Sequence, residues 1–143
     1  MPDAGIGHRI GGATMSSALP APETTPPITM EQVAAFAAAS GDSNPVHLSE
    51  DAARAAGLAG PVLHGMIVAG RFETFLERMH GYEIAELQVR FVRPVPVGSA
   101  LMIAARAIDV SGAQHHIRLL ATIGGVLVSI AEARLEPLSD PTL

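Results

Sequence analysis

The spacing of apolar residues predicts helices in the first part of the chain and strands in the second. One predicted helix carries its apolar residues on a single face, at Val33, Phe36 and Ala37. It begins after Thr29, which can form a capping box with Gln32, and it stops at Gly41. The region before it, residues 1–27, is rich in Gly, Pro and Ala, and we interpret it as an irregular arm with room for a first edge strand.

Two more helices are predicted before the pattern changes. Ser49 is the expected start of a short one, because acidic residues follow it at the positive end of the helix and Gly57 stands after its last turn. A longer helix is predicted from about His64 to Met79. Its residues 66–70 are apolar on every side, so we expect this part to be buried all round.

From Tyr82 onward, apolar and polar residues alternate with the period of two that is typical of strands. Strands are predicted over residues 82–92, 99–110, 114–123 and 126–135, and Gly124-Gly125 predicts a two-residue hairpin. Helices followed by an antiparallel meander indicate an α+β domain over residues 28–143, in which the sheet wraps a central apolar helix.

Composition adds an expectation about assembly. Of the 143 residues, 24 are alanine and only five are aromatic, so each apolar residue buries little surface. A curved sheet with one covered face would leave an edge strand free. We therefore expect a second copy of the chain, paired at that edge, to supply the missing burial.

Charge and missing residue types exclude several functions. The chain has nine Arg and fourteen acidic residues, and no basic cluster is visible in the sequence, so we expect no nucleic-acid partner. The chain contains neither Lys nor Cys, which excludes Schiff-base chemistry, thiol nucleophiles, disulfides and cysteine-based metal sites. No apolar stretch approaches the about 20 residues that span a bilayer, and no signal peptide is recognisable. We expect a cytoplasmic protein without a membrane partner.

Two loops contain the candidate chemistry. In residues 40–47, Pro45 bends the chain and allows Asp42 and His47 to converge, which would place a carboxylate beside an imidazole for acid–base work. Asp42 fits an Asx turn equally well, and Asn44 before a proline is more typical of a residue that binds backbone.

The second loop leads into the long helix. Gly65 lies in the first turn, where glycine lowers helix stability by about 1 kcal/mol relative to alanine. Close approach of a ligand to free amides and tight packing against the sheet explain it equally well. We interpret His64 as a core histidine bonded to backbone. Asp42, His47 and His64 could in principle hold a metal, but we predict none, and His115 and His116 must face opposite sides of a strand.

Taken together, these segments resemble a known family. Residues 36–52 closely resemble the signature of (R)-specific enoyl-CoA hydratases and MaoC-like dehydratases. Residues 63–66 are similar to the family's second hallmark, and residues 90–98 to its strand-then-proline segment. The resemblance covers about residues 28–137.

The resemblance implies a single hot-dog fold, with an overhanging helical segment that carries the active-site loop. It implies that Asp42 and His47 are the catalytic pair and that the Gly65 amide stabilises an oxyanion. Asn44, Pro45 and His64 would support them. The implied reaction is hydration of a trans-2-enoyl thioester or the reverse dehydration. It needs no cofactor beyond the CoA or acyl carrier protein that carries the substrate.

Several alternatives remain open. The chain could be a 3-hydroxyacyl-ACP dehydratase subunit of fatty-acid synthesis, or a hot-dog thioesterase, although such enzymes typically place a lone carboxylate on the central helix. Glu73 and Glu77 are on the predicted helix but beyond its apolar half. A non-catalytic acyl-thioester-binding subunit should lack the Asp/His pair. The expected partner is a second copy or a related hot-dog subunit.

Overall fold

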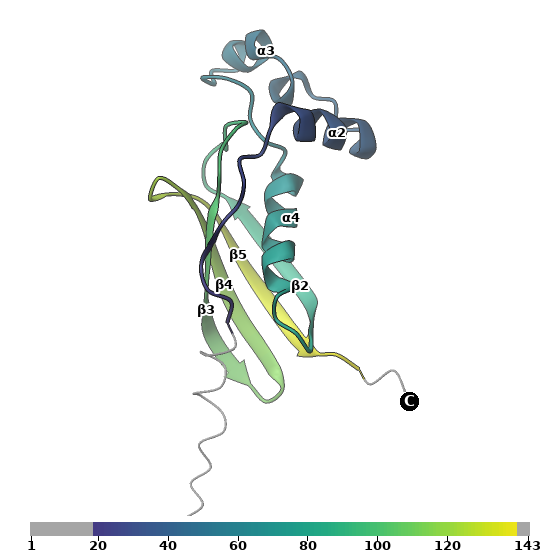
Figure 1. Cartoon of the computed structure of the whole chain (residues 1–143), viewed down its shortest axis with the longest axis vertical. Helices are drawn as coiled ribbons and strands as arrows, with labels where there is room; N and C mark the ends of the chain where they lie inside the picture. Colours follow the sequence, from purple (N-terminus) through teal and green to yellow (C-terminus); the bar gives the residue numbers. More distant parts are fainter. Residues whose placement is uncertain (1–18, 140–143) are drawn as a thin grey trace, which may run out of the picture.

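The computed structural model describes residues 19–139 and shows one antiparallel sheet curved around one helix (Figure 1). The five strands are ordered β1-β3-β4-β5-β2. Their bounds are Glu23–Thr24 for β1, Tyr82–Phe91 for β2, Met102–Ser111 for β3, Gln114–Ile123 for β4 and Val126–Pro137 for β5. The helices are α2 (Met30–Ser40), the short 3-10 helix η1 (Pro45–His47), α3 (Glu50–Ala55) and α4 (Gly65–Leu76).

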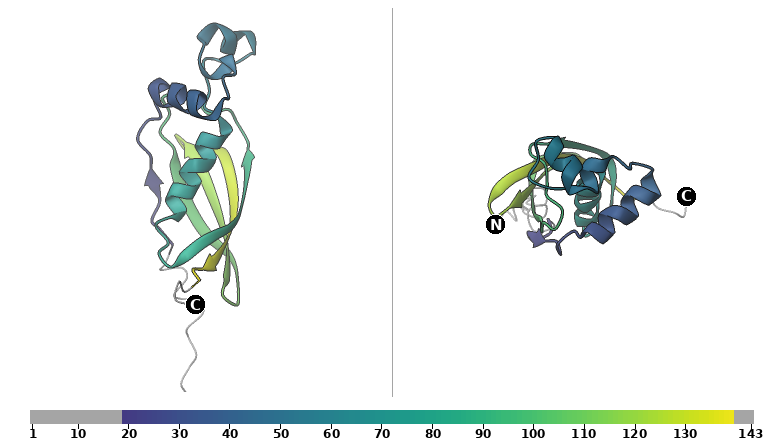
Figure 2. Two further views of the ribbon diagram at one scale, coloured as in Figure 1. Left: turned by 90° about the vertical axis from the view of Figure 1, so that its right-hand side faces the viewer. Right: turned by 90° about the horizontal axis from the view of Figure 1, so that it is seen from above.

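The core lies between α4 and the inner face of the sheet. Figure 2 shows α4 in front of the strands, while α2 and α3 lie beyond one end of the sheet. Phe72 and Val68 of α4 are buried, as are the inward residues of β4 and β5, such as Leu119 and Ala131. The predicted α+β class is confirmed, and a sheet around one helix is the hot-dog arrangement that the resemblance implied.

Local sequence signals set several boundaries. The capping box between Thr29 and Gln32 is present at the start of α2, and Gly41 ends that helix with a φ of 78°. Gly124 and Gly125 have φ values of 54° and 81°, the positive values that a two-residue hairpin requires. As a result, β4 has the predicted bounds.

Two predictions about the long helix were wrong. It begins at Gly65 and ends at Leu76, three residues before the predicted end, and a turn follows. Met66 is 66% exposed although residues 66–70 were expected to be buried all round. Only the face of α4 that meets the sheet is covered in a single chain, and Met66 lies off that face.

The predicted meander was also wrong for one strand. β3, β4 and β5 are consecutive neighbours, but β2 pairs with β5 at the opposite edge from β1. The segment 92–101 crosses from one edge of the sheet to the other, and β3 begins three residues later than predicted. Part of the N-terminal arm forms β1 beside β3, and residues 1–18 and 140–143 lie outside the described part.

Candidate active site

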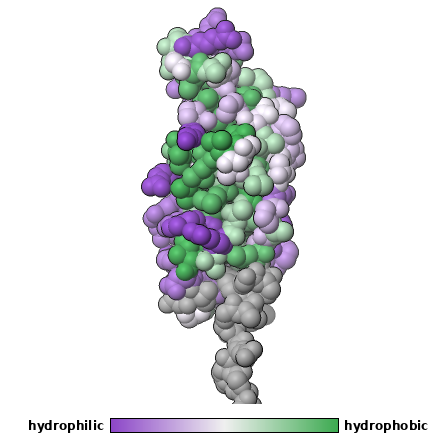
Figure 3. All heavy atoms as spheres, turned by 90° about the vertical axis from the view of Figure 1, so that its left-hand side faces the viewer, coloured by the Kyte–Doolittle hydropathy of each residue, from purple (hydrophilic) through white to green (hydrophobic). Residues whose placement is uncertain are grey.

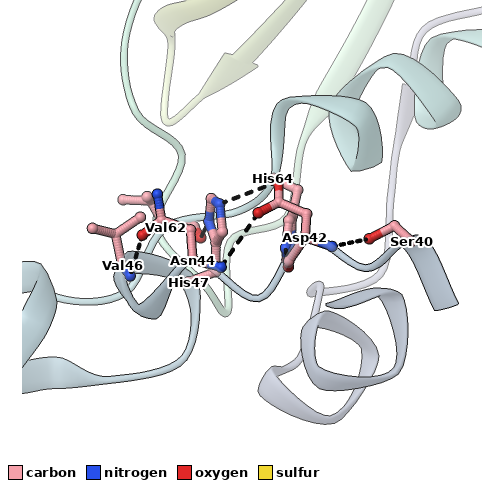
Figure 4. A network of polar contacts seen from close by, with 7 residues as sticks. All are labelled: Ser40, Asp42, Asn44, Val46, His47, Val62 and His64. Carbon is pink, nitrogen blue, oxygen red and sulfur yellow. Dashed lines mark hydrogen bonds and ion pairs between the residues drawn. The ribbon is translucent and has the colours of Figure 1, made fainter. Parts of the chain in front are cut away.

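Asp42 is fixed by a short turn that follows the glycine cap of α2. Its backbone N–H donates to Ser40 Oγ at 3.2 Å, and its Oδ1 accepts from the N–H of Asn44 at 3.3 Å. Asn44 in turn accepts from the Val46 N–H at 3.2 Å and caps η1 (Figure 4). The Asx turn at Asp42 and the backbone role of Asn44 are both present. The second carboxylate oxygen of Asp42 is not used by the turn.

His47 is oriented from the other side by the loop before α4. Its Nδ1 lies 2.8 Å from the carbonyl oxygen of Val62, and because a carbonyl only accepts, Nδ1 must donate. The other ring nitrogen, Nε2, faces Asp42 Oδ2 at 3.9 Å. This gap is too long for a direct hydrogen bond, but a water oxygen about 2.8 Å from each atom fits across it.

His64 contacts both Asp42 and His47. It is 2% exposed, and its Nε2 lies 2.9 Å from the backbone carbonyl of Asp42, to which it donates. Its ring stacks on that of His47, with centroids 3.7 Å apart, and meets the Phe36 ring at 4.8 Å. The interpretation as a core histidine bonded to backbone holds for one nitrogen only. Nδ1 is buried without a partner among residues 19–139.

The three side chains lie close enough to raise the question of a metal. One ligand atom from each of Asp42, His47 and His64 lies within 4.8 Å of the others. The two rings, however, are stacked at 26° to each other. The lone pairs of an imidazole lie in its ring plane, so stacked rings direct them along separate lines and fit poorly to one tetrahedral ion. The geometry suits proton exchange better than chelation, and the absence of a metal stays a prediction.

Gly65 begins α4, and the structure confirms that it packs tightly against the sheet, whereas the approach of a ligand to its amide stays a prediction. A Cβ at this position would lie 2.8 Å from Cζ of Phe91, so the aromatic ring packs directly on the glycine. Its N–H belongs to the first helical turn, where amides have no intrahelical acceptor, and none of residues 19–139 accepts from it. Gly65 is one of the residues that line a cavity of about 340 Å³ with mostly apolar walls, including Leu63, Val68 and Val95.

The structure also places residues that the sequence left unassigned. Phe91 lies in the strand-then-proline segment, but the sequence did not predict its contact with Gly65, because that contact depends on how β2 lies beside α4. His115 is buried and its Nε2 lies 3.1 Å from the Tyr82 hydroxyl, whereas His116 is exposed, as opposite faces require. Glu73 is exposed on α4. None of these polar residues joins the Asp42 cluster.

Comparison with known proteins supports the fold and identifies a family. The model of the MaoC-like domain family matches residues 16–123. An (R)-hydratase from A. caviae involved in PHA biosynthesis has a similar structure, with a TM-score of 0.75 and 26% identity, over 82% of this chain and 93% of that one. R-hydratase PhaJ1 from Pseudomonas aeruginosa has a TM-score of 0.74 and 24% identity, over 84% of this chain and 80% of that one, which bears on the fold.

A shorter match lies within a much larger enzyme. Over 41 residues, 29% of this chain, the sequence is 54% identical to fatty acid synthase subunit beta from Gibberella zeae. The match spans 2% of that protein's length.

Among residues 19–139, no helix is long and apolar enough to cross a membrane.

Proposed function

Because the chain belongs to the MaoC-like domain family, we propose that it adds water to trans-2-enoyl thioesters to give (R)-3-hydroxyacyl thioesters, or catalyses the reverse dehydration. The observation that carries this proposal is the 3.9 Å gap between His47 Nε2 and Asp42 Oδ2. An imidazole and a carboxylate held at this separation can bind one water between them.

In the proposed hydration, the water oxygen is added to the β-carbon of the substrate and a proton is added to the α-carbon. Asp42 removes a proton from the water while the water oxygen forms a bond to the β-carbon. A protonated His47 then delivers its Nε2 proton to the α-carbon, and transfer of one proton from Asp42 to His47 restores the starting state. Asp42 is the principal base in this direction, and dehydration runs the same steps in reverse.

The Gly65 amide is the third group in the proposed mechanism, after Asp42 and His47. Attack at the β-carbon moves negative charge onto the thioester oxygen, giving an enolate-like species. A free N–H at the positive end of α4 stabilises this charge where it develops, without reorganisation during the reaction. The apolar cavity beside Gly65 would hold the start of the acyl chain. Asn44, Pro45 and His64 hold the pair in place.

The proposal extends to the carrier and the assembly. None of these steps requires a metal or a redox cofactor, and CoA or acyl carrier protein carries the acyl group. β2 is the last strand of the sheet, and Phe91 and Val92 at its end are about half exposed. Met66 of α4 is exposed as well. We therefore propose that a second copy, or a related hot-dog subunit, pairs at this edge.

Crotonyl-CoA tests the reaction directly. Hydration removes the absorbance of the conjugated enoyl thioester without releasing thiol, and the product is the (R)-3-hydroxy form. Release of free CoA, read with a thiol reagent, would instead identify a thioesterase. Binding of crotonyl-CoA without any turnover would identify a non-catalytic subunit. Comparison of CoA and acyl-carrier-protein substrates assigns the carrier.

A further inference from the structure

The outer face of the sheet gathers a large share of the chain's few cations. The chain has nine basic residues against fourteen acidic ones. Arg90, Arg106 and Arg118 all line one hollow of about 550 Å³ on the face turned away from α4. Within the described part of the chain, Glu132 is the only carboxylate that lines it. On a chain with a net charge of −5, this local excess of positive charge is unexpected.

The arrangement of these arginines is unfavourable in the free protein. Arg106 on β3 lies directly opposite Arg118 on β4, and like charges at opposed positions destabilise a sheet. Arg118 is partly compensated because it donates to Glu132 at 2.8 Å. Its Nε is nevertheless buried without a hydrogen-bond partner. Among residues 19–139, neither Arg90 nor Arg106 has an ion-pair partner.

Apolar side chains accompany the arginines. Leu120 and Ile130 are paired across β4 and β5, are half-buried and line the same hollow. Figure 3, which shows the molecule from the side of β3 and β4, has apolar side chains gathered in the middle with hydrophilic ones around them. The volume is within the range of small-molecule sites, about 300–1,000 Å³.

We propose that this hollow binds a small amphiphilic anion, with its phosphate or carboxylate on the arginines and its apolar part on Leu120 and Ile130. Guanidinium groups bind such anions through paired, charge-assisted hydrogen bonds. An anion between Arg106 and Arg118 removes their repulsion. None of Asp42, His47 and Gly65 lines this hollow, so the site does not depend on the proposed reaction.

Three probes distinguish the anionic contribution to binding from the apolar one: hexyl phosphate, inorganic phosphate and 1-hexanol. Two-dimensional amide NMR of the full chain should show hexyl phosphate binding with a Kd of about 1 mM or lower and shifts around residues 118–120 and 130–132. Inorganic phosphate should bind at least about tenfold more weakly, and 1-hexanol should leave these amides unchanged. Hexanoate in place of hexyl phosphate tells whether the site prefers phosphate or carboxylate.

Matched variants test the assignment. Arg106→Gln should weaken hexyl phosphate binding at least about tenfold, whereas Arg54→Gln, an exposed arginine of α3, should not change it. Arg90→Gln provides a second variant, and the dispersion of the amide NMR spectrum reports that each protein is folded. Equal binding by Arg106→Gln and the unsubstituted chain would overturn the proposal. So would shifts confined to the Gly65 cavity, or equal binding of inorganic phosphate.

Discussion

At the scale of single residues, the two carboxylate oxygens of Asp42 have different tasks. Oδ1 closes the turn with Asn44 and Oδ2 faces His47. Asp42→Asn keeps an acceptor for the turn but removes the base, so hydration of crotonyl-CoA should fall by about 100-fold or more while the melting temperature changes little. His47→Gln should cause a similar loss. Near-native turnover of both folded variants would refute the acid–base pair.

Two substitutions at Gly65 distinguish the effect of its backbone amide from the effect of an added side chain. Proline is tolerated in the first turn of a helix, and His64 before it has φ −61° and ψ 138°, which suits a residue that precedes proline. Gly65→Ala and Gly65→Pro both press on the Phe91 ring, but only proline removes the N–H. Gly65→Pro should therefore be the slower enzyme in kcat. Equal rates for the two folded variants would rule out the oxyanion role.

We expect His64 to act through its contacts with Asp42 and His47. His64→Phe preserves the aromatic stack on His47 and removes both the donor to the Asp42 carbonyl and the unpartnered buried nitrogen. Loss of that hydrogen bond should lower kcat by about tenfold with little change in KM. Circular dichroism of the same variant should show the fold intact. An unchanged kcat would limit His64 to a packing role.

At the scale of elements, the end of α2 sets the start of the turn that contains Asp42. Gly41 has a φ of 78° and open space where a Cβ would lie, so strain alone opposes a side chain there. Gly41→Ala should reduce the free energy of unfolding by about 1 kcal/mol or more. Gly60 also has open space but no positive φ, which makes Gly60→Ala the matched control. Equal denaturation midpoints would contradict this explanation.

Local signals determined how well each element could be predicted. The Thr29–Gln32 capping box and the Gly124-Gly125 hairpin depend on neighbouring residues, so the sequence located α2 and β4 closely. The exposure of Met66 depends instead on which face of α4 meets the sheet. The same limit applies to the site: the Asp42–His47 spacing was visible in the sequence, whereas the stacking of His64 and the contact of Phe91 with Gly65 require the assembled fold.

At the scale of the whole molecule, the free edge of β2 is the main unpaired feature of the sheet. The strand order shows that β2 is at this edge. The sequence did not predict this, because its pattern suggested a simple meander. If a second copy pairs here, light scattering should give twice the mass of the 14.8 kDa chain. Activity per chain should fall on dilution as the pair separates. A folded monomer with full activity at low concentration would contradict the pairing.

The attachment of residues 42–58 has a consequence for how the protein responds to heat. Figure 1 shows α3 standing away from the sheet, and contacts of Asp42 and His47 themselves help to hold this segment against the loop before α4. Local opening of such a weakly packed unit requires less free energy than unfolding of the central strands. Warming should therefore abolish turnover reversibly before the sheet melts, and amide exchange should be faster in residues 42–58 than in β4. Separation of Asp42 from His47 and release of the segment would then be a single event.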